Sequence, residues 1–384
     1  MTKKFDFPDS FEMCVTCASG VEKVTKSELN RLGVQDVPIV NGIATFLGSQ
    51  SLVAECNVNL RTADRVYIKL GSFVACDFDA VFEGVKAIAF ERYIPYGAKI
   101  IVNGKCVKSK IFAISACQSV IKKAIIERLL EKYSANSFDE YGETYEIAFS
   151  LFKDEMTVML NTSGAGLHKR GYRDLVGIAP IKETLASALL LLSDAYYKNP
   201  FADPFCGSGT LAIEGARIAL NIASGRDRKF AFNGWENFDE RYYEDAITKA
   251  RDNEKLDRKL EFFASDIDAK AIKLATRHAE KAGVKRYINF NVSDVKDFKS
   301  SLPFGTIVTN PPYGERVFDR KEAEGCYKSL GKVFESLDRW SAFVITSHKG
   351  FERYMGKKAD RVRKLYNSNK ECGFYYYYAN KKEK

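Results

Sequence analysis

The sequence predicts an α/β protein in which a smaller α+β half precedes a mixed, mostly parallel sheet packed between helices. From residue 180 onward, short apolar strands alternate with helical patterns, which is typical of βαβ units. Before residue 164 the order of elements is less regular, and Asn41-Gly42 gives a hairpin signal. With 384 residues, the chain is long enough for two or three such domains.

Composition narrows the class of protein further. A hydrophobic fraction of 46% and a charged fraction of 28% are normal for a folded globular chain and exclude a disordered one. The most apolar stretch, residues 185–192, is far shorter than the roughly 18 residues of a membrane span. Because no secretory signal is readable and the nine cysteines suit a reducing compartment, we expect a cytoplasmic protein without membrane contact. With only three histidines, we expect no metal site.

In the N-terminal half, alternating apolar and polar residues predict the strands, and helical periodicity of apolar residues predicts the helices. Strands are expected at 12–17, 37–40, 43–46, 65–73, 99–103, 144–152 and 156–162, and helices at 19–33, 50–60, 77–92 and 114–129. The polar segment 161–173 is expected to link this half to the next.

The C-terminal half is expected to hold the larger sheet. Its strands are predicted at 200–204, 261–265, 287–291, 304–309 and 341–346, and its helices at 185–192, 209–223, 268–283 and 322–337. Residues 361–367 and 372–379 are separated by a short polar turn, so they predict an antiparallel pair at the end of the sheet.

Basic residues concentrate in two stretches, 99–132 and 349–364, within a chain of net charge +9. Such clusters attract a polyphosphate backbone, although a solvated helix face explains either stretch equally well by itself. In the first stretch the candidate nucleic-acid contacts are Lys105, Lys108, Lys110, Lys122 and Lys123.

A glycine turn, Asp203-Pro-Phe-Cys-Gly-Ser-Gly-Thr210, stands where a predicted strand passes into a helix. Gly207 and Gly209 let the backbone approach a ligand, and the helix beginning near Thr210 points free N–H groups toward it. Cys206 lies in the same turn. Asp203 favours a ligand with a cationic amino group, because a carboxylate there would repel a pyrophosphate.

Two more acids follow the next predicted strands. Asp266 is placed to accept both hydroxyls of a ribose, whereas Asp268 suits the N-cap of the following helix. Asp294 follows the next strand, where a carboxylate could bind an adenine amino group; an ordinary surface-loop acid is an equal alternative.

The most specific motif is Asn310-Pro311-Pro312-Tyr313, which also follows an apolar strand. A nucleobase amine is a poor nucleophile because its lone pair is delocalised into the ring. The Asn310 amide oxygen and the Pro311 carbonyl can accept hydrogen bonds from such an amine, which frees its lone pair to attack. Pro312 adds rigidity to the turn, and the Tyr313 ring could stack on a base extruded from its helix.

Together these motifs resemble those of class I S-adenosylmethionine-dependent methyltransferases, whose domain is Rossmann-like with an antiparallel last strand. LHKRGYR, APIKETLASALL, DPFCGSGTLAIEGA and NPPYGERV look like the bacterial 23S rRNA guanine-N2 methyltransferases. The N-terminal half, including LRTADRVYIKL, is similar to that family's ferredoxin-like and THUMP RNA-binding domains. The resemblance implies three domains, a ferredoxin-like unit at 1–60, a THUMP domain at 61–163 and the methyltransferase domain at 164–384.

The resemblance also implies roles for particular residues. S-adenosyl-L-methionine would be the cofactor, with Glu183 and Thr184 beside its methionine end. Residues expected to contact RNA near the junction of the two halves are Lys169, Arg170 and Arg173, with Arg316 just after the NPPY turn. For Lys169, Arg170 and Arg173, a plain charged linker is an equally good explanation of each residue taken alone.

The expected activity is methyl transfer to the exocyclic N2 of a guanosine in 23S rRNA, with a tRNA guanine-N2 methyltransferase as the alternative. A DNA adenine-N6 or protein glutamine methyltransferase would share NPPY but would not need the basic N-terminal module. A non-enzymatic RNA-binding protein is disfavoured because every cofactor motif is intact. The target nucleotide, the oligomeric state and the orientation of the THUMP-like region over the site are not determined by sequence.

Overall fold

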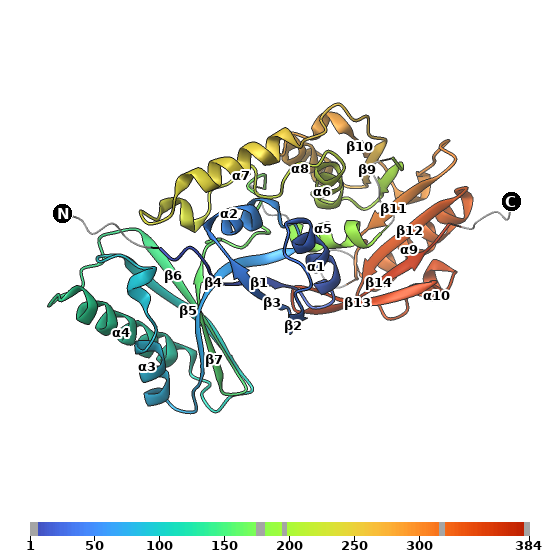
Figure 1. Ribbon diagram of the computed structural model, residues 1–384. Coiled ribbons are helices and arrows are strands. Elements are labelled where there is room, and N and C mark those ends of the chain that lie inside the picture. The colour runs from blue at the N-terminus through green and yellow to red at the C-terminus, as the bar shows by residue number, and fades with distance from the viewer. Residues whose placement is uncertain (1–6, 174–180, 194–197, 315–318, 380–384) are drawn as a thin grey trace.

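A computed structural model describes residues 7–173, 181–193, 198–314 and 319–379. Within these ranges the chain forms two seven-stranded sheets, one in each half (Figure 1). The N-terminal sheet has the order β2-β3-β1-β4-β7-β6-β5, and the C-terminal sheet has the order β10-β9-β8-β11-β12-β14-β13. The predicted α/β class, with an α+β half first, is confirmed.

The N-terminal half contains β1 (Phe11–Cys17), α1 (Glu22–Arg31), β2 (Ile39–Val40), β3 (Ile43–Gly48), α2 (Gln50–Asn59), β4 (Ala63–Val74), α3 (Phe78–Lys86), η1 (Phe90–Arg92), β5 (Lys99–Val107), α4 (Ile114–Tyr133), β6 (Thr144–Phe152) and β7 (Glu155–Asn161). Its longest strand, β4, pairs with β1 through its first residues and with β7 through the rest. One strand therefore joins the two α+β units into a continuous sheet.

Local sequence explains where several of these elements begin and turn. Asn41 and Gly42 both have positive φ, of 51° and 76°, as a two-residue hairpin between β2 and β3 requires. The Ser49 side chain accepts the Leu52 N–H and caps α2, and Asp77 likewise caps α3.

The C-terminal half contains α5 (Glu183–Leu192), β8 (Phe201–Asp203), α6 (Thr210–Ala219), η2 (Ala231–Gly234), α7 (Glu240–Asp252), β9 (Phe262–Asp266), α8 (Ala269–Lys281), η3 (Lys285–Tyr287), β10 (Ile288–Val292), η4 (Val295–Asp297), β11 (Gly305–Thr309), α9 (Arg320–Ser336), β12 (Trp340–Thr346), α10 (Phe351–Met355), β13 (Arg361–Asn367) and β14 (Lys370–Tyr377). Strands β10, β9, β8, β11 and β12 are parallel, and β14 is antiparallel to both β12 and β13. The antiparallel end of the sheet is as predicted.

Helices cover both faces of this sheet because its strands are apolar on both sides. Phe201 and Val308 pack with the core of α5, α6 and α8, whereas their neighbours Ala202 and Ile307 pack with α9 and α10. Burial on both faces is the normal state of a parallel sheet, and it leaves only the strand ends open for a site.

The segment with η2 and α7 was not predicted, and it packs on the N-terminal half. Phe232 and Trp235 belong to the hydrophobic core of that half, and α7 lies along α2 (Figure 1). The Trp235 ring stacks on Tyr145 at 4.8 Å, and its Nε1–H donates to the Thr144 carbonyl. This segment therefore ties the two halves together.

Within the described ranges, every helix is too short or too polar to span a membrane. The same part of the chain does not bring three or more His, Cys, Asp or Glu side chains together in a group that could hold a metal ion.

Candidate active site

The four predicted motifs meet at one edge of the C-terminal sheet. Asp203 ends β8, Asp266 ends β9, Asp294 follows β10 and Asn310 follows β11. These strands are parallel and adjacent in the order β10-β9-β8-β11, so their carboxyl ends lie side by side. Motifs separated by more than 100 residues in sequence thereby line one site.

A direct hydrogen bond joins the end of β8 to the NPPY turn. The Thr309 hydroxyl donates to Asp203 Oδ1 at 2.6 Å, and Asn310 follows Thr309. The Asp203 side chain is 1% exposed, and this burial raises its pKa to about 7, although the Thr309 hydrogen bond acts in the opposite direction. A cationic partner would therefore stabilise the charged form of this buried carboxylate.

The glycine turn between β8 and α6 leaves space for a ligand. Gly207 has φ of +50°, and a Cβ added there would meet no neighbouring atom within 4 Å. Gly209, with φ of +81°, is the N-cap of α6, so the free N–H groups of that helix point to the turn. Cys206 and Thr210 are buried beside it.

The two acids of the neighbouring strands already have partners. Asp266 Oδ2 accepts the Gly207 N–H at 2.9 Å and its Oδ1 accepts the Asp268 N–H, while burial raises its pKa. Asp294 caps η4 and pairs with Lys296 Nζ at 3.2 Å. Asp266 thus holds the glycine turn directly, and Asp294 lies one strand farther along the edge.

The NPPY turn is held from two sides. The Tyr313 hydroxyl donates to Asn310 Oδ1 at 2.7 Å and accepts from Asn367 Nδ2 at 3.3 Å. The Pro312 carbonyl accepts the Tyr327 hydroxyl at 2.6 Å. Tyr313 is half-buried against the β13–β14 hairpin, and burial raises its pKa. In this conformation Tyr313 orients Asn310 as well as offering a ring beside it.

Glu183 and Thr184 are buried at the start of α5. The Glu183 carboxylate forms an ion pair with Arg173, with 3.1 Å between Oε1 and Nη1, and Arg173 also donates to the Ile181 carbonyl. The predicted cofactor residue Glu183 and the predicted RNA residue Arg173 therefore contact each other.

The prediction that Arg170 contacts RNA is wrong for this structure. Its side chain is 1% exposed; it donates to the carbonyls of Leu167 and Arg61, and pairs with Glu214 at 3.5 Å. The guanidinium is used inside the junction of the two halves, so no face of it is left for a phosphate. The neighbouring Lys169 is exposed. Arg316 lies outside the described residues.

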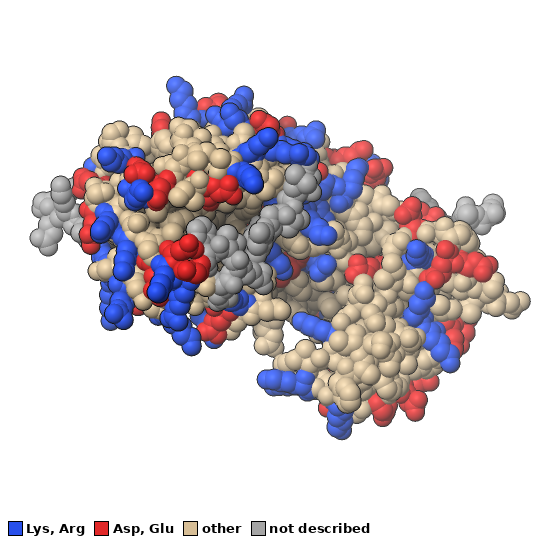
Figure 2. All heavy atoms as spheres, turned by 180° about the vertical axis from the view of Figure 1, so that it is seen from behind, with Lys and Arg blue, Asp and Glu red and all other residues tan. Residues whose placement is uncertain are grey.

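The candidate RNA-binding lysines of the N-terminal half differ in whether they form ion pairs within the protein. Lys105, Lys108 and Lys110 are exposed on β5 and the loop after it. Lys122 pairs with Glu140 at 2.8 Å, and Lys123 lies 3.8 Å from Glu127. Figure 2 shows Lys and Arg side chains on both sides of the hollow between the two halves.

From the sequence, no role was assigned to Thr309, the residue beside the NPPY motif, or to Asn367. Thr309 directly precedes the NPPY turn at a strand end, so its position next to the acid of β8 could have been anticipated from the parallel order of strands. Asn367 carried no signal, because its contact with Tyr313 spans 54 residues and depends on how the hairpin folds back.

Three known domain families together match most of the chain. Residues 170–375 match the RMKL-like methyltransferase domain, residues 12–67 the RlmL ferredoxin-like domain and residues 75–161 the THUMP domain. A Bacillus subtilis (strain 168) protein named "Putative RNA methyltransferase YpsC" is 42% identical over 371 residues, which are 96% of each chain.

Solved structures agree with this assignment. SMU.472, described as "a putative methyltransferase complexed with SAH", is 37% identical with a TM-score of 0.93 over 98% of this chain and 100% of its own. A Listeria monocytogenes str. 4b F2365 protein, described as "a predicted N6-adenine-specific DNA methylase", is 42% identical with a TM-score of 0.92 over 97% of both chains. With its glycine turn, strand-end acids and NPPY turn on one sheet edge, the chain belongs to the RMKL-like methyltransferase family and carries RlmL ferredoxin-like and THUMP domains before that domain.

Proposed function

We propose that this methyltransferase transfers a methyl group from S-adenosylmethionine to the exocyclic N2 of a guanosine in RNA, with 23S rRNA as the substrate. The observation that carries the proposal is the Thr309–Asp203 hydrogen bond, which joins the glycine turn to the NPPY turn. A cofactor held at one turn would therefore lie beside an amine held at the other.

The residues at the glycine turn suit S-adenosylmethionine, which supplies the methyl group when it is bound. Asp203 offers a buried carboxylate for the α-ammonium, and Asp266 offers one for the ribose hydroxyls. The open space at Gly207 lets the backbone approach the ligand. A solved relative in complex with SAH, the product left after methyl transfer, supports the same cofactor.

At the NPPY turn the chain would activate the amine by positioning. A carbonyl oxygen has two lone pairs, so Asn310 Oδ1 can keep the Tyr313 hydroxyl and accept one amine N–H. The Pro311 carbonyl would accept the second N–H. Both contacts favour a pyramidal nitrogen whose lone pair faces the methyl group, and orientation of the two reactants supplies most of the acceleration.

RNA is favoured over DNA as the substrate by the domains that precede the catalytic one. The THUMP match at residues 75–161 and the exposed lysines Lys105, Lys108 and Lys110 provide a surface for a phosphate backbone. The name of the Bacillus relative points to RNA, whereas that of the Listeria relative points to adenine in DNA. The choice of rRNA over tRNA rests only on how closely the segments DPFCGSGTLAIEGA and KRGYR resemble the motifs of the 23S rRNA enzymes.

Labelled methyl transfer tests the proposal. The purified protein is incubated with methyl-labelled S-adenosylmethionine and, separately, with ribosomal RNA, total tRNA, DNA and protein, and the digested products are identified. We expect labelled N2-methylguanosine from ribosomal RNA. Labelled N2-methylguanosine from tRNA alone would support the alternative substrate, and labelled N6-methyladenosine or no label would contradict the proposal.

The Asn310→Ala variant tests the role of the amide oxygen. Because the acceptor for the reacting amine is lost, we expect kcat to fall about 100-fold or more. Cofactor affinity, measured by calorimetry, should stay within about twofold because Asn310 would contact only the amine. Asn289→Ala, at an exposed asparagine of β10, is the matched control. Normal turnover in Asn310→Ala would disprove the assigned role.

A further inference from the structure

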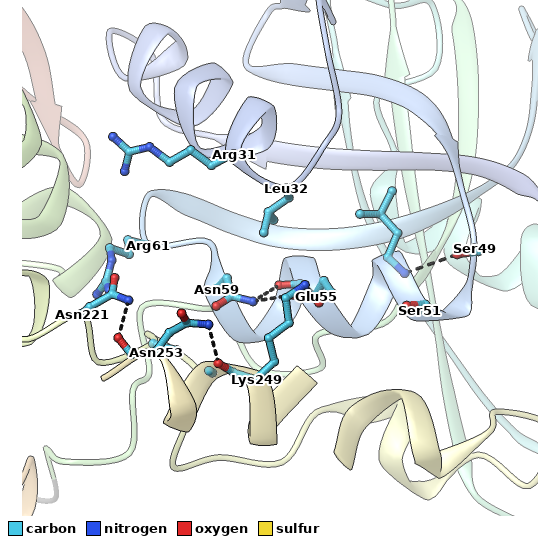
Figure 3. A pocket seen from close by; sticks show the side chains of 13 residues that line it. Arg31, Leu32, Ser49, Ser51, Glu55, Asn59, Arg61, Asn221, Lys249 and Asn253 are labelled. Carbon is cyan, nitrogen blue, oxygen red and sulfur yellow. Dashed lines mark hydrogen bonds and ion pairs between the residues drawn. The ribbon is translucent and has the colours of Figure 1, made fainter. Parts of the chain in front are cut away.

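A polar cleft of about 530 Å³ lies between the end of α1, helix α2 and helix α7 (Figure 3). Asn221, which lines it, follows the C-terminal end of α6, whereas the glycine turn precedes the first residue of that helix. A ten-residue helix is about 15 Å long, so the cleft and the candidate active site lie at opposite ends of α6. The cleft is therefore a separate feature of the molecule.

Positive charge dominates the cleft. Arg31, Arg61 and Lys249 line it with a single carboxylate, Glu55. That carboxylate is already bound on both oxygens, by Lys249 Nζ at 2.7 Å and by Asn59 Nδ2 at 2.9 Å. Figure 3 shows both guanidinium groups at the same end of the cleft, away from Glu55.

Neither guanidinium forms a hydrogen bond or a close ion pair with any residue in the described ranges. Arg61 is half-buried where it lines the cleft, and its Nη1 atom is buried without an acceptor in the described ranges. Burial lowers the pKa of Arg61 to about 10, and the side chain still carries its charge at neutral pH. A half-buried guanidinium charge without a close ion pair is costly, and an anion bound in the cleft would offset it.

Two acids, Glu28 and Glu214, act electrostatically on Arg61, and both are occupied by other donors. Glu28 accepts the N–H groups of Arg61 and Thr62 and the Thr62 hydroxyl. Glu214 accepts hydroxyls from Tyr172 and Ser187. These acids offset the charge of Arg61 from a distance without contacting its guanidinium, so the guanidinium remains available to an anion.

We propose that this cleft binds a phosphate group between Arg31 and Arg61. A planar guanidinium presents two parallel N–H groups that match two phosphate oxygens, and two such forks at one end of a cleft select phosphate over a simple halide. The phosphate belongs either to a small nucleotide or to the RNA backbone, since both present the same oxygens to the cleft.

Titration of the whole protein with inorganic phosphate tests the site. Calorimetry is done at constant ionic strength with chloride as the replaced anion, so that general screening does not change. Wild type should bind one phosphate. Arg31→Ala and Arg61→Lys should each weaken binding about tenfold, because the first removes a fork and the second keeps the charge but loses the fork geometry. Lys23→Ala, at an exposed lysine of α1 outside the cleft, is the matched control and should bind as wild type does.

Two further titrations identify the source of the phosphate. If RNA supplies it, Arg31→Ala also weakens binding of a labelled single-stranded RNA, and inorganic phosphate competes with that RNA for wild type. If a small nucleotide supplies it, RNA affinity is unchanged and adenosine monophosphate binds more tightly than phosphate. Absence of phosphate binding by wild type, or equal binding by wild type, Arg31→Ala and Arg61→Lys, would overturn the proposal.

Discussion

Asp203, at the end of β8, is almost completely shielded from water, and its pKa of about 7 places its titration near neutral pH. The cofactor ammonium requires the charged carboxylate, so below pH 7 binding must first remove a proton. As the pH falls below 7 we expect S-adenosylmethionine affinity to decrease, approaching about tenfold for each pH unit, because protonated Asp203 no longer pairs with the ammonium. Calorimetry between pH 5.5 and 8.5 measures this.

The control for that pH dependence is Asp203→Asn, which cannot titrate at this position. It should bind the cofactor weakly and with no inflection near pH 7. A wild-type affinity that does not change between pH 5.5 and 8.5 would show that Asp203 does not face the ammonium.

Tyr313 acts on the same site through its hydroxyl, which contacts both Asn310 and Asn367. Tyr313→Phe keeps the ring and removes the hydrogen bond that orients the Asn310 amide. Since a single hydrogen bond contributes about 0.5–1.5 kcal/mol, we expect kcat to fall up to about tenfold. Cofactor affinity should be unchanged. If kcat is unaffected while Tyr313→Ala is inactive, the ring alone matters and stacking is its role.

At the scale of elements, the turn from β8 into α6 depends on Gly207, whose φ is +50°. Gly207→Ala places a methyl group in the space left for the cofactor and adds about 1–2 kcal/mol of backbone strain. We expect a folded protein whose cofactor affinity falls at least about tenfold, measured by calorimetry and thermal unfolding.

Gly325→Ala is the matched control for this substitution. Gly325 lies within α9, and an added Cβ meets nothing within 4 Å there either, but its φ is not positive. Alanine should stabilise the helix by about 0.5–1 kcal/mol and leave cofactor binding unchanged. Equal cofactor affinity in the two variants would show that the space at Gly207 is not used.

At the scale of the whole molecule, the segment with η2 and α7 connects the two halves through Trp235, which is 3% exposed. Trp235→Ala removes the ring stacked on Tyr145. The lost packing between the halves should lower the stability of the folded protein by about 3–5 kcal/mol. We expect RNA methylation to fall sharply while cofactor affinity is retained, because the cofactor residues lie on the other sheet. Small-angle scattering would report the loosened arrangement.

Tyr242→Ala serves as the comparison, because Tyr242 is an exposed aromatic residue on α7, at 38% exposure. It should leave methylation and scattering unchanged. If Trp235→Ala behaves like Tyr242→Ala, the relative position of the two halves does not depend on this contact.

Local patterns in the sequence determined much of this protein. Alternating strands and helices predicted the parallel sheet, and Asp203, Asp266, Asp294 and Asn310 were each predicted to stand at or after a strand end. The strand order of the structure brings these ends to one edge. They meet there because parallel strands direct all their carboxyl ends to the same side. The hairpin at Asn41-Gly42 was predictable because only a few residue types accept its positive φ.

Only the tertiary structure decided the contacts between distant segments. Arginine is a residue type that often contacts RNA, yet Arg170 is buried against Glu214. The sequence suggested that the Tyr313 ring is free to stack on a base, yet its hydroxyl accepts a hydrogen bond from Asn367 in the β13–β14 hairpin. The core contribution of Trp235 and the cleft at Arg31 and Arg61 arise where segments of the two halves meet. Periodicity reports which face of an element is apolar and carries no information about which distant element covers it.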